Sequence, residues 1–259
     1  MEKSIKQKSD LVTLFLALLT LVFVSSCDSL DVENNDFKII AHRGYWKAVD
    51  GAENSIASLR AAANLGIDGV ELDVRITKDD SLILMHDGDW GGHDIASSTL
   101  EEIRSTRLPN GEQVPTLREY MLEAKEHPGM MLFMDVKYPE LCVKIKQLAE
   151  GLYLPNPIVY ATNISTASEL KKTGNVIAVC SGNVNADKLV EAGVDGFSAL
   201  LDDLKSSPSN ITDANNKGLM TVGSVVNVES ELIWCVNNGV RHIITNDPFT
   251  AINFRSECR

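Results

Sequence analysis

The chain has 259 residues, of which 44% are hydrophobic and 23% charged, as in folded globular proteins and unlike disordered chains. Its 36 acidic side chains outnumber its 24 basic ones, and the net charge of −12 argues against a protein that binds a nucleic-acid backbone. Five cysteines in this length do not describe a disulfide-rich mini-protein, and no CxxC pair marks a zinc or redox site.

Residues 1–26 have the pattern of an export signal. Three lysines precede an apolar run over 11–24, which is shorter than the roughly 20 residues that a membrane-spanning helix needs. The following Ser-Ser-Cys27 resembles the lipobox of bacterial lipoproteins, whose cysteine becomes the lipidated first residue. We therefore expect a signal peptide over 1–26, an exported protein anchored to a periplasmic or cell-surface membrane through Cys27, and a flexible acidic tether over 27–36. The alternative is an uncleaved N-terminal anchor in which Cys27 is incidental.

From residue 37 onward, short apolar runs alternate with longer amphipathic stretches. The apolar runs predict strands over 37–41, 69–74, 82–86, 131–136, 158–161, 176–180, 196–199, 220–223 and 242–245. Helical spacing predicts helices over 54–65, 117–125, 140–150, 165–173, 185–192 and 229–238. About eight β-then-α units favour a single α/β domain over 37–259, a (β/α)8 TIM-type barrel with parallel strands. An open doubly wound sheet is the alternative, although no GxGxxG follows an early strand.

Glu71 and Asp73 are two positions apart in a predicted strand, so their side chains share one face. Two carboxylates side by side in an apolar strand repel each other and are costly to bury unpaired. One interpretation is that a cation lies between them. The other is an exposed edge strand, or an ion pair with Arg75 or Lys78.

Three other predicted strands also end in polar side chains. The run 37–41 is followed by His42 and Arg43, and the run 82–86 ends in His86. The run 131–136 carries Asp135 and is followed by Lys137. Because the carboxyl ends of all strands open on one face of a parallel barrel, we expect these groups to converge at one mouth.

These residues stand in motifs that resemble the signature of the glycerophosphodiester phosphodiesterase family. The matching motifs are His42-Arg43-Gly44, Glu53-Asn54, Glu71-x-Asp73, Thr77-Lys78-Asp79, His86-Asp87, Val114-Pro115-Thr116-Leu117 and Ile244-Thr245-Asn246-Asp247-Pro248. The resemblance covers roughly the whole chain after the expected signal and is most specific in its first half.

The resemblance implies a TIM-type barrel with one divalent cation, Ca²⁺ or Mg²⁺. The implied metal ligands are Glu71, Asp73 and Asp135; the implied acid and base are His42 and His86, in either order; Arg43 and Lys137 would hold the phosphate, with Glu53 and Asn54 in support. The implied reaction is hydrolysis of a small glycerophosphodiester to glycerol 3-phosphate and an alcohol. In the family the glycerol 2-hydroxyl is thought to attack first, giving a cyclic phosphate that water then opens.

The sequence departs from the family pattern at three places. Asp135 stands where the family usually has Glu, and Asp-x-Lys there resembles the related sphingomyelinase D toxins. Ala52 replaces the usual Pro before Glu-Asn, which should change only loop stiffness. Ser224 stands at about the place of a frequent Trp, so a wall of the substrate site should differ.

An aromatic surface could instead come from Tyr45, Trp46 or Trp90, which follow the predicted site strands, unless these rings only pack their loops.

Two other functions stay open on the sequence alone. The Asp135-x-Lys137 pattern and the expected lipid anchor indicate a phospholipase D-like enzyme acting on intact lipids with the same barrel. The missing Trp indicates a non-catalytic lipoprotein that binds a phosphate ester. Because every expected ligand and acid–base position is filled, we predict the phosphodiesterase, without nucleic acid or an obligate protein partner.

Overall fold

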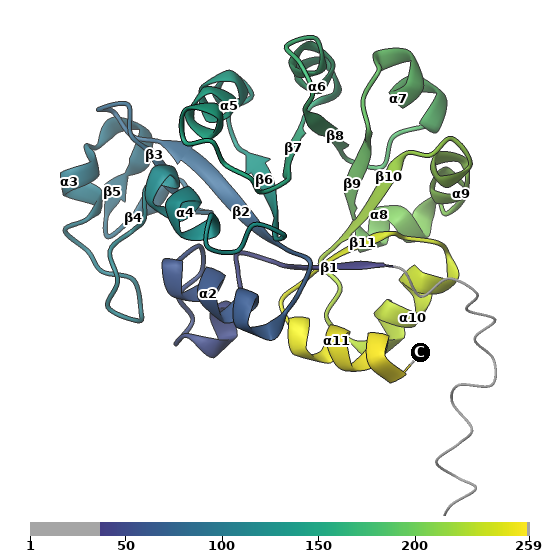
Figure 1. Cartoon of the computed structure of the whole chain (residues 1–259), viewed down its shortest axis with the longest axis horizontal. Coiled ribbons are helices and arrows are strands. Elements are labelled where there is room, and N and C mark those ends of the chain that lie inside the picture. The colour runs from purple at the N-terminus through teal and green to yellow at the C-terminus, as the bar shows by residue number, and fades with distance from the viewer. Residues whose placement is uncertain (1–36, 258–259) are drawn as a thin grey trace, which may run out of the picture.

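A computed structural model describes residues 37–257, which form a closed barrel with helices around it (Figure 1). The expected signal over 1–26, Cys27 and the tether over 27–36 lie outside the described residues, so this division of the chain stays a prediction. Within 37–257, no helix is both long enough and apolar enough to cross a bilayer.

The barrel consists of eight parallel strands. They are β1 (Lys38–Ala41), β2 (Gly69–Ile76), β6 (Met131–Val136), β7 (Ile158–Thr162), β8 (Ile177–Ser181), β9 (Gly196–Leu200), β10 (Met220–Ser224) and β11 (His242–Thr245). Their order around the barrel is β1-β11-β10-β9-β8-β7-β6-β2, and β1 also pairs with β2. This closing pair confirms the TIM-type barrel, and the alternative of an open sheet is wrong.

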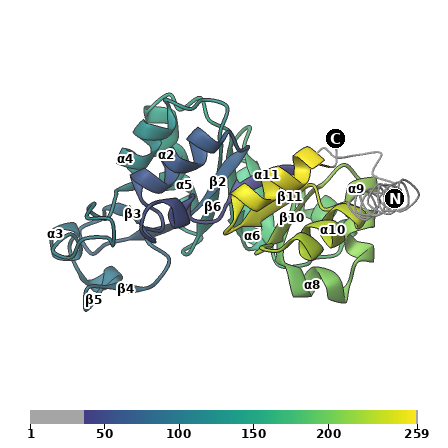
Figure 2. The ribbon, with the colours of Figure 1, turned by 90° about the horizontal axis from the view of Figure 1, so that it is seen from below.

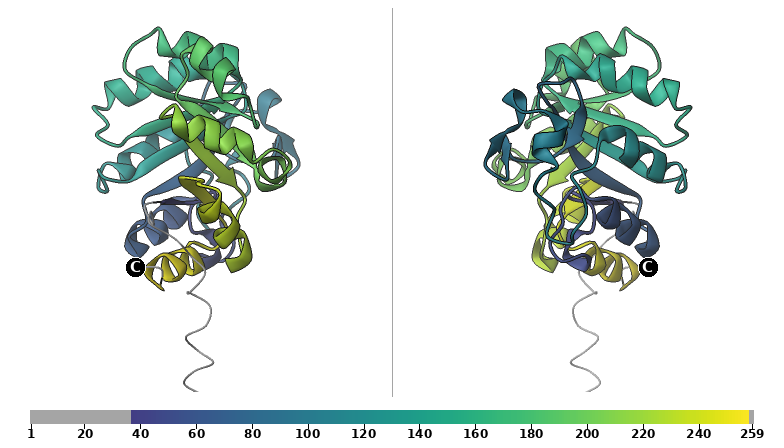
Figure 3. Two further views of the ribbon diagram at one scale, coloured as in Figure 1. Left: turned by 90° about the vertical axis from the view of Figure 1, so that its right-hand side faces the viewer. Right: turned by 90° about the vertical axis from the view of Figure 1, so that its left-hand side faces the viewer.

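Helices surround the strands on the outside (Figures 1 and 3). They are α2 (Ile56–Leu65), α4 (Leu117–Ala124), α5 (Leu141–Gly151), α6 (Ile164–Lys171), α7 (Ala186–Ala192), α8 (Leu201–Ser206), α9 (Ser209–Asn216), α10 (Glu229–Asn237) and α11 (Pro248–Glu257). The first of them begins where the Ser55 side chain accepts from the amide of Ser58, and it ends at Gly66, whose φ of 73° favours glycine.

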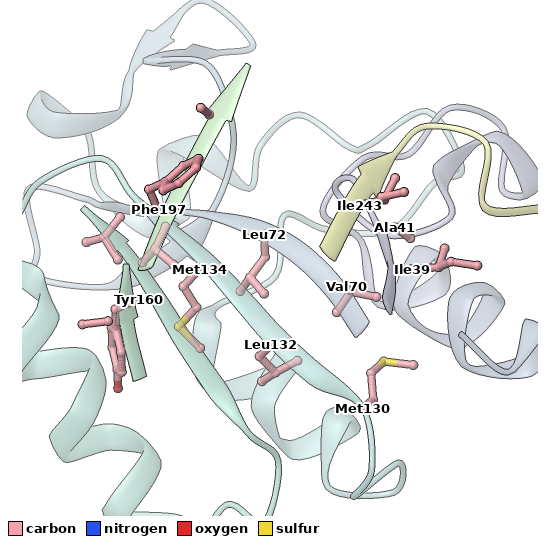
Figure 4. Packing of buried hydrophobic residues seen from close by; sticks show 14 of the residues in the cluster. Ile39, Ala41, Val70, Leu72, Met130, Leu132, Met134, Tyr160, Phe197 and Ile243 are labelled. Atoms are coloured by element: carbon pink, nitrogen blue, oxygen red, sulfur yellow. The ribbon is translucent and has the colours of Figure 1, made fainter. Parts of the chain in front are cut away.

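Along the barrel strands, successive side chains point alternately outward beneath the helices and inward into the barrel. Outward side chains such as Ile39, Val70 and Leu72 pack beneath the helices (Figure 4). Inward side chains fill a smaller core that includes Ile40, Phe133 and Ile244. Since Val70 and Leu72 point outward, the alternating residues of β2 point into the barrel.

The predicted strand over 82–86 is not a barrel strand. The shorter β3 (Leu82–Leu84) pairs antiparallel with the end of β2, beyond the barrel. After it, β4 (Asp89–Trp90), β5 (His93–Asp94), η2 (Ile95–Ser97) and α3 (Leu100–Ile103) form an excursion on one side of the barrel (Figure 2). Because β3 runs back along β2, it returns the chain to the barrel mouth, where the Met85 amide donates to the Asp73 carbonyl over 3.1 Å.

Candidate active site

Three carboxylates meet at the mouth of the barrel. Glu71 and Asp73 point inward from β2, and Asp135 is the register partner of Asp73 on β6. One oxygen of each lies within 4.8 Å of the others. Glu71 is 4% exposed and Asp73 is 1% exposed, so two of these acids are almost fully removed from water. The interpretation of the strand as an exposed edge is therefore wrong.

The two buried acids have different electrostatic surroundings. Burial raises the pKa of Glu71 well above its usual range, and the neighbouring Asp73 carboxylate adds to this rise. Burial would also raise the pKa of Asp73, but Lys137 and a hydrogen bond from Asn54 hold it below its usual range. At Glu71, burial and the neighbouring carboxylate outweigh the charge of Lys137 and the hydrogen bond from the Arg43 amide.

Two cationic side chains reach the same cluster. The Lys137 ammonium lies 2.8 Å from Asp73 Oδ1 and 2.6 Å from Asp135 Oδ2. The Arg43 guanidinium pairs with Glu53 at 2.6 Å and has its Nε 3.5 Å from Asp73 Oδ2. Burial alone would lower the pKa of Arg43, but the Glu53 carboxylate raises it overall. Both cations are thus held as charged groups at the edge of the acid cluster.

A tight loop after β1 positions Arg43. Its φ of 56° is left-handed, a conformation that costs a non-glycine residue on the order of 1 kcal/mol. In this conformation the Arg43 amide donates to Glu71 Oε2 over 2.9 Å. A Cβ on the following Gly44 would lie 2.3 Å from Ser58 Oγ, so only glycine lets the loop approach α2 so closely.

Two imidazoles flank the acid cluster and line the same cavity. His42 Nε2 lies 3.9 Å from Glu71 Oε2, and burial lowers the pKa of His42. His86 Nδ1 lies 2.8 Å from Asp87 Oδ1, and its side chain is 41% exposed. The structure therefore brings both predicted imidazoles to one mouth, although β3 delivers His86 from outside the barrel.

The supporting residues divide into two kinds. The Asn54 amide donates to Asp73 Oδ2 over 2.9 Å, and Asn54 Oδ1 accepts from the Asp73 backbone amide over 3.1 Å. Glu53 pairs with Arg43 and does not join the three-carboxylate cluster. Asn246 was not predicted as a site residue, yet its Oδ1 lies 2.7 Å from His42 Nδ1 and 3.4 Å from Trp46 Nε1. The sequence feature that could have indicated Asn246 is the family motif over 244–248, which contains this residue.

A cavity of about 570 Å³ lies at the carboxyl ends of the strands, and six of the predicted site residues line it: His42, Arg43, Glu71, Asp73, His86 and Asp135. Lys137, Glu53 and Asn54 reach the site through their contacts with Asp73, Asp135 and Arg43. Ser224 lines it, as expected for the position where the family often has Trp. The cavity is lined by other residues than Tyr45, Trp46 and Trp90. Trp90 instead donates through Nε1 to a backbone carbonyl in the excursion, 3.2 Å away. Trp90 thus follows the alternative of loop packing, and the residues at the ends of β9 and β10 that line the cavity are small or aliphatic, such as Ala199, Ser224 and Val225.

The barrel thus gathers oxygen ligands, imidazoles and two protein cations at one mouth, a combination that suits the hydrolysis of a phosphate ester. Residues 42–250 match the family model described as "Glycerophosphoryl diester phosphodiesterase family". The chain belongs to this family and is a phosphoric diester hydrolase of its class.

Individual relatives agree with this assignment. Human glycerophosphodiester phosphodiesterase 1 is 34% identical over 171 residues, which cover 59% of this chain and 50% of that protein. A glycerophosphodiester phosphodiesterase of Caldanaerobacter subterraneus subsp. tengcongensis is 29% identical over 238 residues, or 83% of this chain and 96% of that one. The match thus spans half of the human relative and nearly all of the bacterial one.

Solved structures agree as well. A glycerophosphodiester phosphodiesterase from Parabacteroides distasonis superposes with a TM-score of 0.79 at 28% identity, covering 86% of this chain and 99% of that one. An Oleispira antarctica phosphodiesterase in complex with the product sn-glycerol-3-phosphate has a TM-score of 0.71 at 20% identity, covering 85% of this chain and 96% of that one. At this low identity, the similarity to the Oleispira antarctica structure shows a shared fold alone.

Proposed function

We propose that the chain hydrolyses glycerophosphodiesters to glycerol 3-phosphate and an alcohol, with one divalent cation and two histidines. The observation that carries this proposal is the three-carboxylate cluster, which shares one cavity with two imidazoles and lies against two cations. Family membership supports the reaction class, and the roles below are our assignment.

Glu71, Asp73 and Asp135 would hold the cation. All three supply oxygen ligands, which hard cations such as Ca²⁺ and Mg²⁺ prefer over the nitrogen and sulfur ligands typical of zinc. The raised pKa of Glu71 fits the site as well, because burial and the Asp73 carboxylate outweigh the charge of Lys137 there, and a bound cation would add the missing compensation. When bound, such a cation offsets the phosphate charge and makes a neighbouring hydroxyl more acidic.

Arg43 and Lys137 would bind the phosphate oxygens. A guanidinium can donate two parallel hydrogen bonds to a phosphate, and an ammonium adds a point charge. Both groups are anchored by carboxylates on one side, Glu53 for the arginine and Asp135 for the lysine. This anchoring fixes the cations before substrate arrives and so reduces the entropy lost on binding.

His42 is the better candidate for the base. Asn246 Oδ1 accepts from Trp46 Nε1 and therefore accepts from His42 Nδ1 as well, which leaves the lone pair of His42 on Nε2. The lowered pKa of His42 keeps that ring neutral near pH 7. Its Nε2 would take the proton of the glycerol 2-hydroxyl as the hydroxyl oxygen bonds to phosphorus.

His86 would then act as the acid. Asp87 binds its Nδ1 and orients the ring, so Nε2 is free to deliver a proton to the departing alkoxide as the phosphorus–oxygen bond breaks. The product of this step is a cyclic phosphate of glycerol. Water opens the ring in a second step with the two proton transfers reversed, giving glycerol 3-phosphate.

The test is release of glycerol 3-phosphate from glycerophosphoethanolamine and glycerophosphocholine by the purified protein with added Mg²⁺ or Ca²⁺. Metal-dependent release supports the proposal, and no turnover of any such diester defeats it. Intact lysophospholipid serves as a third substrate. If it is turned over in preference to the deacylated diesters, the phospholipase D-like alternative replaces the proposal.

We also propose that the protein is an exported lipoprotein held to a membrane through Cys27. The support is the order of basic start, short apolar run and Ser-Ser-Cys27 in the sequence. The full chain expressed in bacteria should incorporate labelled palmitate and remain with membranes. Cys27→Ala should lose both properties, whereas Cys258→Ala should keep them. Equal labelling of both variants would contradict the anchor.

A further inference from the structure

The active-site cavity has two chemically different halves. The side formed by β1, β2 and β6, with the loop after β3, carries the imidazoles, the guanidinium and the three carboxylates. The side formed by β7, β8, β9 and β10 is lined by small and aliphatic residues, such as Ala161, Ser181, Ser198 and Ser224. Asp203 is the one charged side chain among the residues that line this second side.

Asp203 lies in the first turn of α8, the helix that begins immediately after β9. Its carbonyl oxygen accepts from Asn183 Nδ2 over 2.8 Å and from Ser206 Oγ over 2.7 Å, so the turn that carries it is fixed to the neighbouring loop. Its carboxylate makes no ion pair with any other residue of 37–257. The neighbouring Asp202 is also exposed but does not line the cavity.

Two serines on the strands line the same side of the cavity as Asp203. Ser181 and Ser198 are register partners on β8 and β9, and both line the cavity. The bond from the Gly182 amide to the Ser198 carbonyl, 2.7 Å long, holds the end of β8 against β9. A ligand on this side therefore meets hydroxyl oxygens and one free carboxylate, all of which accept hydrogen bonds.

Among residues 37–257, none that line this side of the cavity is aromatic. Phe133 is the aromatic residue among those that line the cavity, it belongs to β6, and it is 2% exposed. A trimethylammonium group has no N–H to donate and is usually recognised by aromatic faces. A primary ammonium donates three hydrogen bonds and suits hydroxyls and a carboxylate.

We propose that this half of the cavity binds the leaving alcohol and that Asp203 selects alcohols that carry a primary ammonium group. The inference rests on the proposed function, because it assigns the alcohol part of the same diester. The phosphate belongs at the charged half, where Arg43 and Lys137 lie, and the attacking glycerol hydroxyl must stay beside His42. The leaving oxygen must stay within reach of His86, and in-line displacement directs the rest of the alcohol away from the attacking oxygen, toward the half formed by β7, β8, β9 and β10.

The test compares kcat/KM for three diesters that differ only in the alcohol. Glycerophosphoethanolamine carries a primary ammonium, glycerophosphocholine a quaternary one, and glycerophosphoglycerol no charge on the alcohol. We expect the ethanolamine diester to be the best substrate of the unaltered protein. In Asp203→Asn the ratio of kcat/KM for the ethanolamine diester to that for the glycerol diester should fall about fivefold, the size of a partly exposed ion pair.

Asp202→Asn is the matched control, since it removes the same charge one residue away and outside the cavity. It should leave the ratio within twofold of the unaltered protein. An equal loss on all three diesters in Asp203→Asn, or a ratio that does not change, overturns the inference while the hydrolysis itself stands. A similar fall of this kcat/KM ratio in Asp202→Asn would show a general effect of negative charge and would also overturn the inference. If no diester is turned over by the unaltered protein, the proposed function fails first.

Discussion

Asn246 Oδ1 lies 2.7 Å from Nδ1 of His42, although 204 positions separate the two residues in the chain. The contact exists because the barrel closes: β1 pairs with β11, and Ala41 lies opposite Thr245 immediately before the two side chains. The last strand of the barrel therefore orients an imidazole carried by the first. His42 is thus positioned by the tertiary fold rather than by its own motif.

Asn246→Ala should lower kcat about tenfold with little change in KM, because His42 would keep its place near the substrate but lose its fixed ring orientation. Steady-state kinetics on a glycerophosphodiester measures both constants. Asn175→Ala, at the opposite end of the barrel, is the control and should change neither. A rise in KM without a fall in kcat would show that Asn246 binds substrate instead.

His42→Ala and His86→Ala should each lower kcat by about 10² to 10⁴ on natural diesters. The two variants should differ on a glycerol phosphodiester of p-nitrophenol, because an acidic alcohol leaves without being protonated. That substrate should restore most of the activity of His86→Ala and little of that of His42→Ala. The reverse pattern would exchange the acid and base roles. His93→Ala, in the hairpin of β4 and β5, should remain near full activity.

Asp135→Asn should weaken the apparent affinity for the divalent cation by at least about tenfold, because it removes one charged oxygen ligand from the cluster. Activity measured against metal concentration gives this affinity. Asp89→Asn, a charge loss in the outer hairpin, is the control. If the metal dependence of Asp135→Asn is unchanged, Asp135 is not a metal ligand and only pairs with Lys137.

The barrel was predictable from the sequence because its strands carry a buried apolar run of characteristic length. The candidate site was predictable because its residues stand in motifs on or just after barrel strands, as with Glu71 and Asp73 on β2. The direction of β3 was not predictable, since a run such as 82–86 reads the same in a parallel or an antiparallel pair. Its antiparallel course still brings His86 to the mouth.

Other features depended on tertiary structure. The helices α8 and α9 were missed because they are short, with six and eight residues, and each buries only two side chains, Leu201 and Leu204 in α8 and Ile211 and Ala214 in α9. The orienting role of Asn246 was missed because only barrel closure brings it to His42. Trp46 was predicted as a possible substrate surface, yet it lies against Asn246.

Asp68 should contribute to stability in a pH-dependent way. Burial would raise its pKa, but the Ile39 amide, the Arg255 guanidinium and Lys38 hold the pKa below its usual range. Its Oδ2 lies 2.9 Å from the Ile39 amide and 2.5 Å from Arg255 Nη1, so it ties α11 to β1. Because the folded pKa is depressed, the stabilisation is complete above the unfolded pKa of about 4 and is lost as pH falls through the folded value.

Asp68→Asn should therefore lower the free energy of unfolding by about 2 kcal/mol at pH 7. The difference from the unaltered protein should shrink below about pH 4, where Asp68 becomes protonated. Urea unfolding at several pH values measures both quantities. Asp213→Asn, on the exposed face of α9, should cost almost nothing at any of them. A difference that stays constant down to pH 2 would contradict the ionic role of Asp68.

The most direct measurement is the number of divalent ions bound per chain, taken together with turnover, after chelation and stepwise return of Mg²⁺ or Ca²⁺. Turnover should fall to background on chelation and return as one ion binds, and Glu71→Gln should lose both the ion and the activity. Full turnover by the metal-free protein, or ion binding that Glu71→Gln leaves unchanged, would contradict the account.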